Sequence, residues 1–289
     1  GFNGVAGLRP SPGIVPRGKR LQPFDTLWVE GPMGRSIADI SLMLDAGGGQ
    51  VISDPLSIDT HVSSYLAAIK KEKLPKRVAF SNDLGIVPVA KEVVHATETA
   101  IRQLANQGID VTDAIPDFTG ILDAFHTLRA VLLGTMMGEL LETSRDQISE
   151  DIIGNIERGF TVTPEELFLA ERLRWSLTQK MAKFFETHDL LLCPSATIPP
   201  FPIEQRFVTE IDGQPCETYI DWFAITFAIT MTSCPVVSMP CGFTADGLPI
   251  GIQVVGKPRG EVALLQAAQC LERIFDVSGQ LPINPRDDV

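Results

Sequence analysis

The sequence predicts an α/β protein in which helices flank a mixed β-sheet. A strand, a helix and a second strand follow one another over residues 77–111, an order typical of this class. Two β-prone runs at 235–243 and 249–255 are separated by Asp246-Gly247, a strong short-range signal for an antiparallel hairpin. The 289 residues are 44% hydrophobic, which is enough for a sizeable core. These observations together predict one mixed α/β unit.

The chain begins with a segment in which glycine and proline are frequent. Prolines at several positions of residues 1–35 prevent regular helix, so we expect this segment to form a winding connection. Ser36 and Asp39 then have the spacing of a capping box, which predicts the start of a helix. Apolar residues continue at helical spacing up to the glycines at 47–49, where the helix is expected to end.

The next elements are predicted from a short alternating run and a longer helical pattern. Residues 77–81 alternate in part and are bounded by polar residues, as in a strand. Apolar residues recur at helical spacing from Val93 to Leu104, and the pattern stops near Gly108. Residues 109–111 then resume extended character.

The middle of the chain is predicted to be mostly helical. Long apolar helical patterns occupy residues 120–160. The next helix has a clear start, because Thr163 caps it, Pro164 takes its first position and Glu166 completes the capping box. It leads to a buried strand at 189–193, and side chains at the end of such a strand commonly face a ligand crevice.

The last predicted elements are the hairpin and one further helix. The runs at 235–243 and 249–255 should pair antiparallel. Apolar residues from Val262 to Leu271 recur at helical spacing and predict a final helix that begins at about Glu261. No internal repeat or linker divides the chain, so residues 1–289 are expected to belong to a single domain.

Charge and hydropathy narrow the classes of partner. The chain has 24 Lys and Arg against 36 Asp and Glu, a formal net charge of −12 at pH 7. Nucleic acid and anionic membrane surfaces would be repelled on average, which favours a small neutral substrate. The longest apolar runs are much shorter than the roughly 20 residues that span a bilayer. We therefore expect neither a nucleic-acid partner nor a membrane segment, and residues 1–7 lack the features of a secretory signal.

The cysteines and histidines predict reduced thiols and no metal site. Five cysteines are an odd number and lie mostly in apolar contexts, which argues against a disulfide framework and favours a cytoplasmic protein. No C-x-x-C pair exists, and the four histidines are dispersed, so zinc ligation is not expected. No other cofactor is expected. The cysteines are Cys193, Cys216, Cys234, Cys241 and Cys270, and the histidines are His61, His95, His126 and His188.

Three blocks of motifs follow one another along the chain. The first comprises GVAGLRPSPG at 4–13, GPMGRSIAD at 31–39 and Asp54-Pro55. The second is DLLLCP at 189–194, and the third is CPVVSMPCGF at 234–243 with GLPIGIQ after it. In this order and at these separations, over nearly the whole chain, the blocks resemble the amidase-signature family.

This resemblance implies a fold, an activity and the location of the catalytic groups. It implies the amidase-signature architecture, with residues 1–289 as the C-terminal portion of its single domain. The implied activity is hydrolysis of a linear carboxamide by a serine that is activated through a second serine and an unprotonated lysine. In the family all three residues precede the block that begins here at Phe2. No catalytic residue is therefore expected within this chain, which alone should be inactive.

The resemblance also points to residues that contact the substrate. In the family the region comparable to Asp221 and Trp222 lines the acyl pocket. Cys193 and Ser195, at a predicted strand end before a proline-rich stretch, are similar candidates for the pocket wall. Met33 follows a Gly-Pro turn that the family places near the active site. The alternatives are that Asp221 caps a helix, that Trp222 and Met33 belong to the core, and that the strand simply leads into a loop.

Other functions remain open at this level. A catalytic cysteine is disfavoured because Cys193 and Cys234 lie in apolar runs without a basic partner. Lys19, Lys70, Lys71 and Lys73 lie in polar runs that indicate solvated surface instead of a neutral base. The chain could instead be a non-catalytic truncated form or subunit, or an amidotransferase-type subunit with partner subunits.

The sequence also predicts that the chain needs a partner. The expected partner is the missing N-terminal portion of the same protein, although a homo-oligomer is also possible. The apolar runs at 190–193 and 235–239 are expected to lose part of their cover without that portion. The substrate is expected to be a small-molecule amide.

Overall fold

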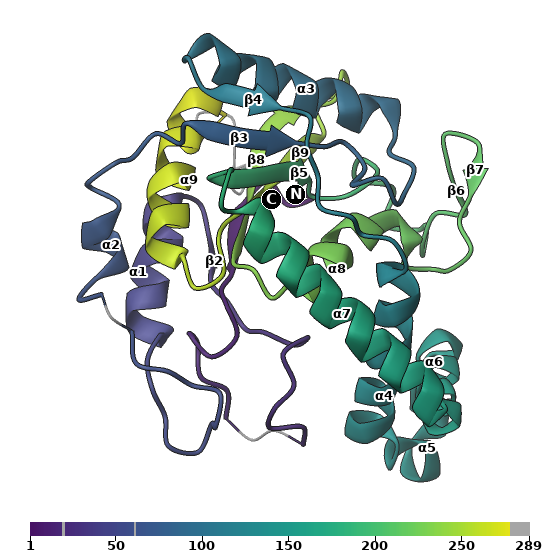
Figure 1. The fold of residues 1–289 in the computed structure, drawn as a ribbon. Coiled ribbons are helices and arrows are strands. Elements are labelled where there is room, and N and C mark those ends of the chain that lie inside the picture. The colour runs from purple at the N-terminus through teal and green to yellow at the C-terminus, as the bar shows by residue number, and fades with distance from the viewer. Residues whose placement is uncertain (19–20, 61, 278–289) are drawn as a thin grey trace, which may run out of the picture.

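A computed structural model describes residues 1–18, 21–60 and 62–277. Within them, seven strands form one sheet in the order β2-β1-β8-β9-β5-β3-β4, and a two-stranded hairpin lies apart from it (Figure 1). The strands of the sheet are β1 (Ala6–Arg9), β2 (Met33–Gly34), β3 (Arg77–Phe80), β4 (Asp110–Thr112), β5 (Leu190–Pro194), β8 (Val236–Phe243) and β9 (Pro249–Val255). The small hairpin consists of β6 (Glu210–Ile211) and β7 (Gln214–Pro215).

The sheet is mixed, as the sequence predicts. Strand β3 pairs parallel with both β4 and β5, whereas all the other pairs of the sheet are antiparallel. The predicted C-terminal hairpin is confirmed, because β8 and β9 pair antiparallel around the turn that contains Gly247. The predicted strand–helix–strand unit is also confirmed: α3 (Lys91–Asn106) connects β3 to β4.

Helices cover both faces of the sheet (Figure 1). Helices α1 (Ile37–Gly47), α2 (Tyr65–Ala68), α3 and α9 (Glu261–Phe275) contribute to one hydrophobic cluster. Helices α4 (Ile121–Met137), α7 (Pro164–Phe184) and α8 (Ala224–Met231) contribute to a second. Shorter or peripheral elements are α5 (Leu140–Thr143), η1 (Arg145–Gln147), α6 (Glu150–Thr161) and η2 (Asp221–Phe223).

Alternation along the strands divides the core between these two faces. In β5, Leu190 and Leu192 belong to the first cluster, while Leu191 and Cys193 belong to the second. Successive side chains of a strand point to opposite faces, so a fully apolar strand indicates cover on both sides. The uninterrupted apolar run of β5 therefore follows from its central position in a two-sided sheet.

Both predicted capping boxes are present. The Ser36 hydroxyl accepts from the Asp39 N–H, and the Asp39 carboxylate accepts from the Ser36 N–H at 3.0 Å. Thr163 and Glu166 make the same reciprocal pair at the start of α7, with proline in the first turn. These bonds satisfy N–H groups that a helix start leaves without an intrahelical acceptor, so the local sequence determines where α1 and α7 begin.

The prediction that residues 1–35 form only a winding connection is wrong in part. Strand β1 lies within the sheet between β2 and β8, with Gly7 opposite both Met33 and Ser238. Gly31 permits this arrangement, because a Cβ on it would lie 1.9 Å from the Leu8 carbonyl oxygen. A strand of four residues has almost no local sequence pattern when its partner strands are distant in sequence. The many glycines and prolines of this segment therefore predicted a loop and hid the strand.

The expected exposure of the apolar runs is also corrected. Leu190 to Cys193 and Val237 are buried by the chain's own helices, at 2% exposure or less. Large exposed apolar side chains occur at other places in the described residues. Among residues 21–52 they are Leu21, Phe24, Trp28, Met33, Leu42, Met43, Val51 and Ile52.

Candidate functional site

Polar side chains meet where β5 ends beside β8 and β9. Cys193 lies opposite Gln253, and Gln253 lies opposite Ser238, so the three residues form one row across the strands. Directly paired residues of neighbouring antiparallel strands share a face, and Ser195 is two residues beyond Cys193 on the same side. The Gln253 side chain reaches the Ile225 carbonyl oxygen at 3.5 Å, which shows that this face is the one covered by α8.

Ser195 is held in place by three hydrogen bonds. Its hydroxyl lies 2.8 Å from the Ser238 hydroxyl, and its N–H donates to the Gly251 carbonyl at 2.9 Å. The Thr226 hydroxyl of α8 donates to the Ser195 carbonyl at 2.6 Å. A Cβ on Gly251 would lie 2.7 Å from the Ser195 Oγ, so glycine is required for this close approach. The half-buried Ser195 hydroxyl thus has a defined position.

Trp222 forms an aromatic wall next to this serine pair. Its ring stacks on Phe2 with centroids 5.2 Å apart and an interplanar angle of 22°. Phe201 packs edge-on against the same ring at 5.3 Å. The Trp222 Nε1–H donates to the Tyr219 carbonyl at 3.1 Å, and the Thr197 hydroxyl donates to the Trp222 carbonyl at 2.6 Å. The segment after β5 and the start of α8 are therefore joined, and the half-buried Trp222 lies at their junction.

Asp221 braces the turn that precedes α8. Its carboxylate accepts from the N–H groups of Glu217 at 2.6 Å and Thr218 at 2.8 Å, and from the Thr218 hydroxyl. An aspartate is favoured at this position because its carboxylate accepts hydrogen bonds from three donors of one short turn. This geometry favours a structural role for Asp221, but not the helix cap given above as the alternative, because its carboxylate accepts from residues that precede the helix and no side chain caps α8.

The Cys193 side chain belongs to the hydrophobic cluster that includes α8, whereas Phe2, Phe201 and Trp222 pack against the other cluster. Cys193 is fully buried, and burial raises the pKa of its thiol far above the usual range, so the group stays protonated. The Gln253 amide reaches the Cys193 Sγ at 3.4 Å and donates to the Pro194 carbonyl at 3.0 Å. Gln253 therefore has a structural role, because its buried amide finds backbone partners.

Met33 lies apart from the other predicted site residues. It is 66% exposed on β2, and Gly7 of β1 separates it from Ser238. Two strand spacings place it about 10 Å from the serine pair along the sheet. The structure therefore brings Trp222, Asp221, Ser195 and Cys193 to one end of β5 and α8, while Met33 lies at the sheet edge.

Two cavities adjoin these residues. One, between Phe2, Ser195 and Gly251, has a volume of about 10 Å³, which is room for at most one water molecule. This cavity at the serine pair is therefore too small for a substrate. The second has a volume of about 520 Å³ and lies between α4, α6 and the segment that leads to Trp222.

The larger cavity has a polar lining organised by Arg129. Its guanidinium donates to the Asn155 Oδ1 at 2.5 Å and to the Tyr219 hydroxyl at 2.7 Å. It forms no ion pair with a carboxylate of the described residues. Burial lowers the pKa of nearby His126, so its imidazole is neutral at pH 7. The cavity can therefore offer both charged and neutral hydrogen-bonding groups to a ligand.

Sequence reasoning missed Ser238, Phe2 and Arg129 as neighbours of the site. Ser238 could have been found from the strand register, because β8 pairs with β9 and β9 pairs with β5, which brings Ser238 level with Cys193. No sequence pattern indicates Phe2 or Arg129, since their contacts with Trp222 and Tyr219 join residues that are far apart in the sequence. Lys19 and His61, which the sequence assigns to no site, lie outside the described residues.

Comparison with known proteins identifies the family. A family model for amidases matches residues 1–265. The chain belongs to the amidase family. An acylamidase of Rhodococcus erythropolis is 28% identical over 274 residues, which cover 94% of this chain and 57% of that protein. A glutamyl-tRNA(Gln) amidotransferase subunit of Thermodesulfovibrio yellowstonii is 26% identical over 297 residues, covering 94% of this chain and 60% of its own length.

Solved structures show the same amidase-signature fold. A bacterial aryl acylamidase of this family superposes with a TM-score of 0.84 at 22% identity, over 98% of this chain and 62% of that one. A 6-aminohexanoate cyclic dimer hydrolase bound to its substrate gives 0.82 at 25% identity, over 96% of this chain and 62% of that one. The chain thus spans about three fifths of the length of these amidase relatives.

The helices and the titratable side chains of the described residues bear on membrane and metal binding by this amidase-family chain. No helix there combines the length and the apolar character needed to cross a bilayer. No group of three or more His, Cys, Asp or Glu side chains in the same residues is arranged to hold a metal ion.

Proposed function

We propose that the protein to which this chain belongs hydrolyses a carboxamide to a carboxylate and ammonia or an amine. In this reaction a serine oxygen attacks the amide carbonyl, the C–N bond breaks, and the amine leaves with a proton from the base. Water then cleaves the acyl-enzyme ester and regenerates the serine. Membership of the amidase family carries this proposal. The nucleophilic serine, the bridging serine and the lysine base are proposed to lie outside residues 1–289.

The proposed contribution of this chain is one wall of the acyl pocket. Ser195 and Trp222 are the residues best placed for it, because both are partly exposed and held rigidly by neighbouring backbone groups. Asp221 is proposed to support this wall by holding the turn before Trp222, and Cys193 is proposed to pack next to Gln253, beside the serine pair. Arg129 and the Tyr219 hydroxyl would contact a polar part of the substrate beyond the wall.

Two features support the proposal that further polypeptide completes the molecule. The Arg9 guanidinium donates to the Cys234 carbonyl at 2.6 Å, but its buried Nε and Nη1 have no acceptor in the described residues. Burial lowers the pKa of Arg9 to about 10, because the charged guanidinium has lost most of its contact with water. Orphaned buried donors are rare in complete proteins. The exposed apolar side chains of residues 21–52 are the second feature.

Labelling and turnover test the proposal directly. The complete protein and residues 1–289 alone would each be incubated with a fluorophosphonate that acylates activated serines, and assayed for release of amine from a panel of linear amides. We expect the complete protein to turn over at least one amide and to be labelled outside residues 1–289. The isolated chain should be neither labelled nor active, because loss of the nucleophile removes the covalent route.

Labelling of a serine within 1–289 would show that the nucleophile lies in this chain. A complete protein that binds amides without turnover would favour the non-catalytic alternative. The amidotransferase alternative is favoured by the similarity to a subunit of glutamyl-tRNA(Gln) amidotransferase. It predicts that glutamine is hydrolysed efficiently only when partner subunits are added.

A further inference from the structure

Another cavity lies at the end of β5 that is opposite to Ser195. Its volume is about 370 Å³, and it is formed where β3 and β5 begin and where β9 leads into α9. Leu190 begins β5 and lines this cavity, whereas Ser195 follows the end of the same strand. The two places are therefore separated by the full length of β5, and a ligand in one does not contact the other.

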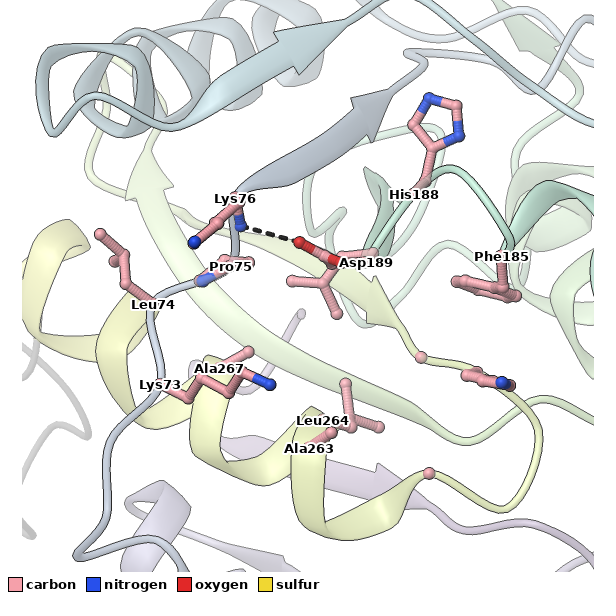
Figure 2. A pocket seen from close by; sticks show the side chains of 14 residues that line it. Lys73, Leu74, Pro75, Lys76, Phe185, His188, Asp189, Ala263, Leu264 and Ala267 are labelled. Carbon is pink, nitrogen blue, oxygen red and sulfur yellow. Dashed lines mark hydrogen bonds between the residues drawn. The ribbon is translucent and has the colours of Figure 1, made fainter.

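Three lysines line this cavity in a protein whose net charge is −12. They are Lys73 and Lys76, from the segment before β3, and Lys257, from the turn after β9. None of their ammonium groups forms an ion pair with a carboxylate of the described residues. Figure 2 shows the Lys73 side chain extending in front of α9 toward Leu264. Positive groups gathered without a counter-charge leave a locally positive potential at the cavity.

One carboxylate, that of Asp189, also lines the cavity but is occupied elsewhere. It accepts from the N–H groups of Lys76 at 2.8 Å and Arg77 at 3.0 Å, and pairs with the Arg77 guanidinium at 3.5 Å (Figure 2 shows the first bond). No lysine side chain takes part in these bonds. Asp189 therefore joins the starts of β3 and β5 instead of neutralising the three ammonium groups.

The cavity has an apolar floor. Leu264, Ala267, Leu190 and Phe185 line it and are themselves at most 7% exposed, so the floor is part of the packed core. A Cβ on Gly256 would lie 3.0 Å from the Leu264 Cβ, so glycine there lets the turn after β9 lie close against α9. A rigid apolar floor beneath a cationic rim is the arrangement that binds molecules with an apolar body and an anionic head.

We propose that this cavity binds a small organic carboxylate with an apolar body. The apolar part would lie on Leu264 and Phe185, and the carboxylate would be held by Lys73 and Lys257 at the rim. Ammonium groups suit this head group as point charges without a fixed fork geometry. The volume lies within the range of small-molecule sites. This proposal does not depend on the amide-hydrolysing activity proposed above.

Calorimetry with octanoate tests the proposal. The complete protein would first be treated with a fluorophosphonate, so that octanoate held at an amide site is not counted. We expect saturable binding with a Kd of roughly 0.1–1 mM that weakens as salt is added. Octan-1-ol, which lacks the charge, and inorganic phosphate, which lacks the apolar body, should each bind about tenfold more weakly or not at all.

Variants locate the binding. The double variant Lys73→Gln/Lys257→Gln should weaken octanoate binding about tenfold, and Ala263→Phe, on the exposed side of α9, should block the cavity. Lys71→Gln is the matched control, because this exposed lysine belongs to the same segment but does not line the cavity, and it should bind as the wild type does. Octanoate affinity unchanged in the double variant, or equal affinity for phosphate, would overturn the proposal. Thermal melts would confirm that each variant is folded.

Discussion

At the scale of single residues, Trp222 and Asp221 are adjacent in sequence but differ in what they contact. The Trp222 indole contacts rings from distant segments, Phe2 and Phe201, and part of its surface remains exposed. The Asp221 carboxylate contacts only the turn directly before it. The first environment can shape a binding surface, whereas the second stabilises the local backbone. The two residues should therefore respond differently to substitution.

This difference gives a prediction for substrate preference. In the complete protein, Trp222→Ala should change the ratio of kcat/KM between amides with small and large acyl groups by about tenfold, because the aromatic wall is removed. Trp222→Phe should retain most of the wild-type ratio. Asp221→Asn should lower the free energy of unfolding by about 1–2 kcal/mol and affect all substrates alike, since one charged acceptor of the turn is lost. Steady-state kinetics on an amide series, with urea unfolding of each variant, would check both expectations. An unchanged ratio for Trp222→Ala would remove this residue from the acyl pocket.

At the scale of elements, the starts of two parallel strands are joined through Asp189. Its carboxylate immediately precedes β5 and accepts from the N–H groups at the start of β3. Burial acts to raise the pKa of Asp189, but the bonds from Arg77 and Lys76 lower it by more, so the pKa lies below its ordinary value of 3.8. The carboxylate therefore stabilises the pairing of β3 with β5 only while it is ionised.

A pH dependence follows from this lowered pKa. A group with a lower pKa in the folded chain stabilises it fully above the unfolded pKa, and this contribution is lost as the pH falls through the folded pKa. Asp189→Asn should thus be less stable than the wild type at pH 7 and should lose less stability on acidification to pH 3. Urea unfolding at both pH values measures this. Asp110→Asn, an exposed change on neighbouring β4, is the control and should follow the wild-type curve. Identical pH dependence in Asp189→Asn and wild type would contradict the prediction.

At the scale of the whole molecule, helices cover the two faces of the sheet, and β2 and β4 form its two edges. The hydrophobic clusters on both faces are closed by helices of this chain. Strand β2, at one edge, is only two residues long and has the exposed Met33, and α1, which contacts β2, has the exposed Leu42 and Met43. An apolar surface of this kind usually marks an interface.

We therefore predict that residues 1–289 do not remain a lone monomer. Purified chain should elute together with a second polypeptide, such as the rest of its own protein, or as a homo-oligomer. Size-exclusion chromatography with light scattering, followed by denaturing mass spectrometry of the peak, makes the measurement. Adding charge at the edge, as in Met33→Lys, should weaken the association, while Leu248→Lys, an exposed apolar position in the β8–β9 turn, should leave it intact. A monodisperse monomer of 31.5 kDa with a cooperative melt would contradict the prediction.

The sequence by itself determined those features whose causes are local. The capping boxes at Ser36 and Thr163, the hairpin turn at Asp246-Gly247 and the buried character of β5 each depend on neighbouring residues, and all are present in the structure. The order of the motifs also predicted the amidase family, because motifs are recognised from residue identities alone and require no information about contacts.

Only the tertiary structure decided what depends on distant contacts. It placed β1 between β2 and β8, paired Ser195 with Ser238, and stacked Phe2 on Trp222. These contacts join segments that are 43 residues apart for the serines and far more for the aromatic pair, and local propensity carries no information about them. The same limit applies to the lysine-lined cavity, because Lys73 and Lys76 before β3 are distant in sequence from Lys257 after β9 and lie near it only because β3, β5 and β9 are neighbours in one sheet.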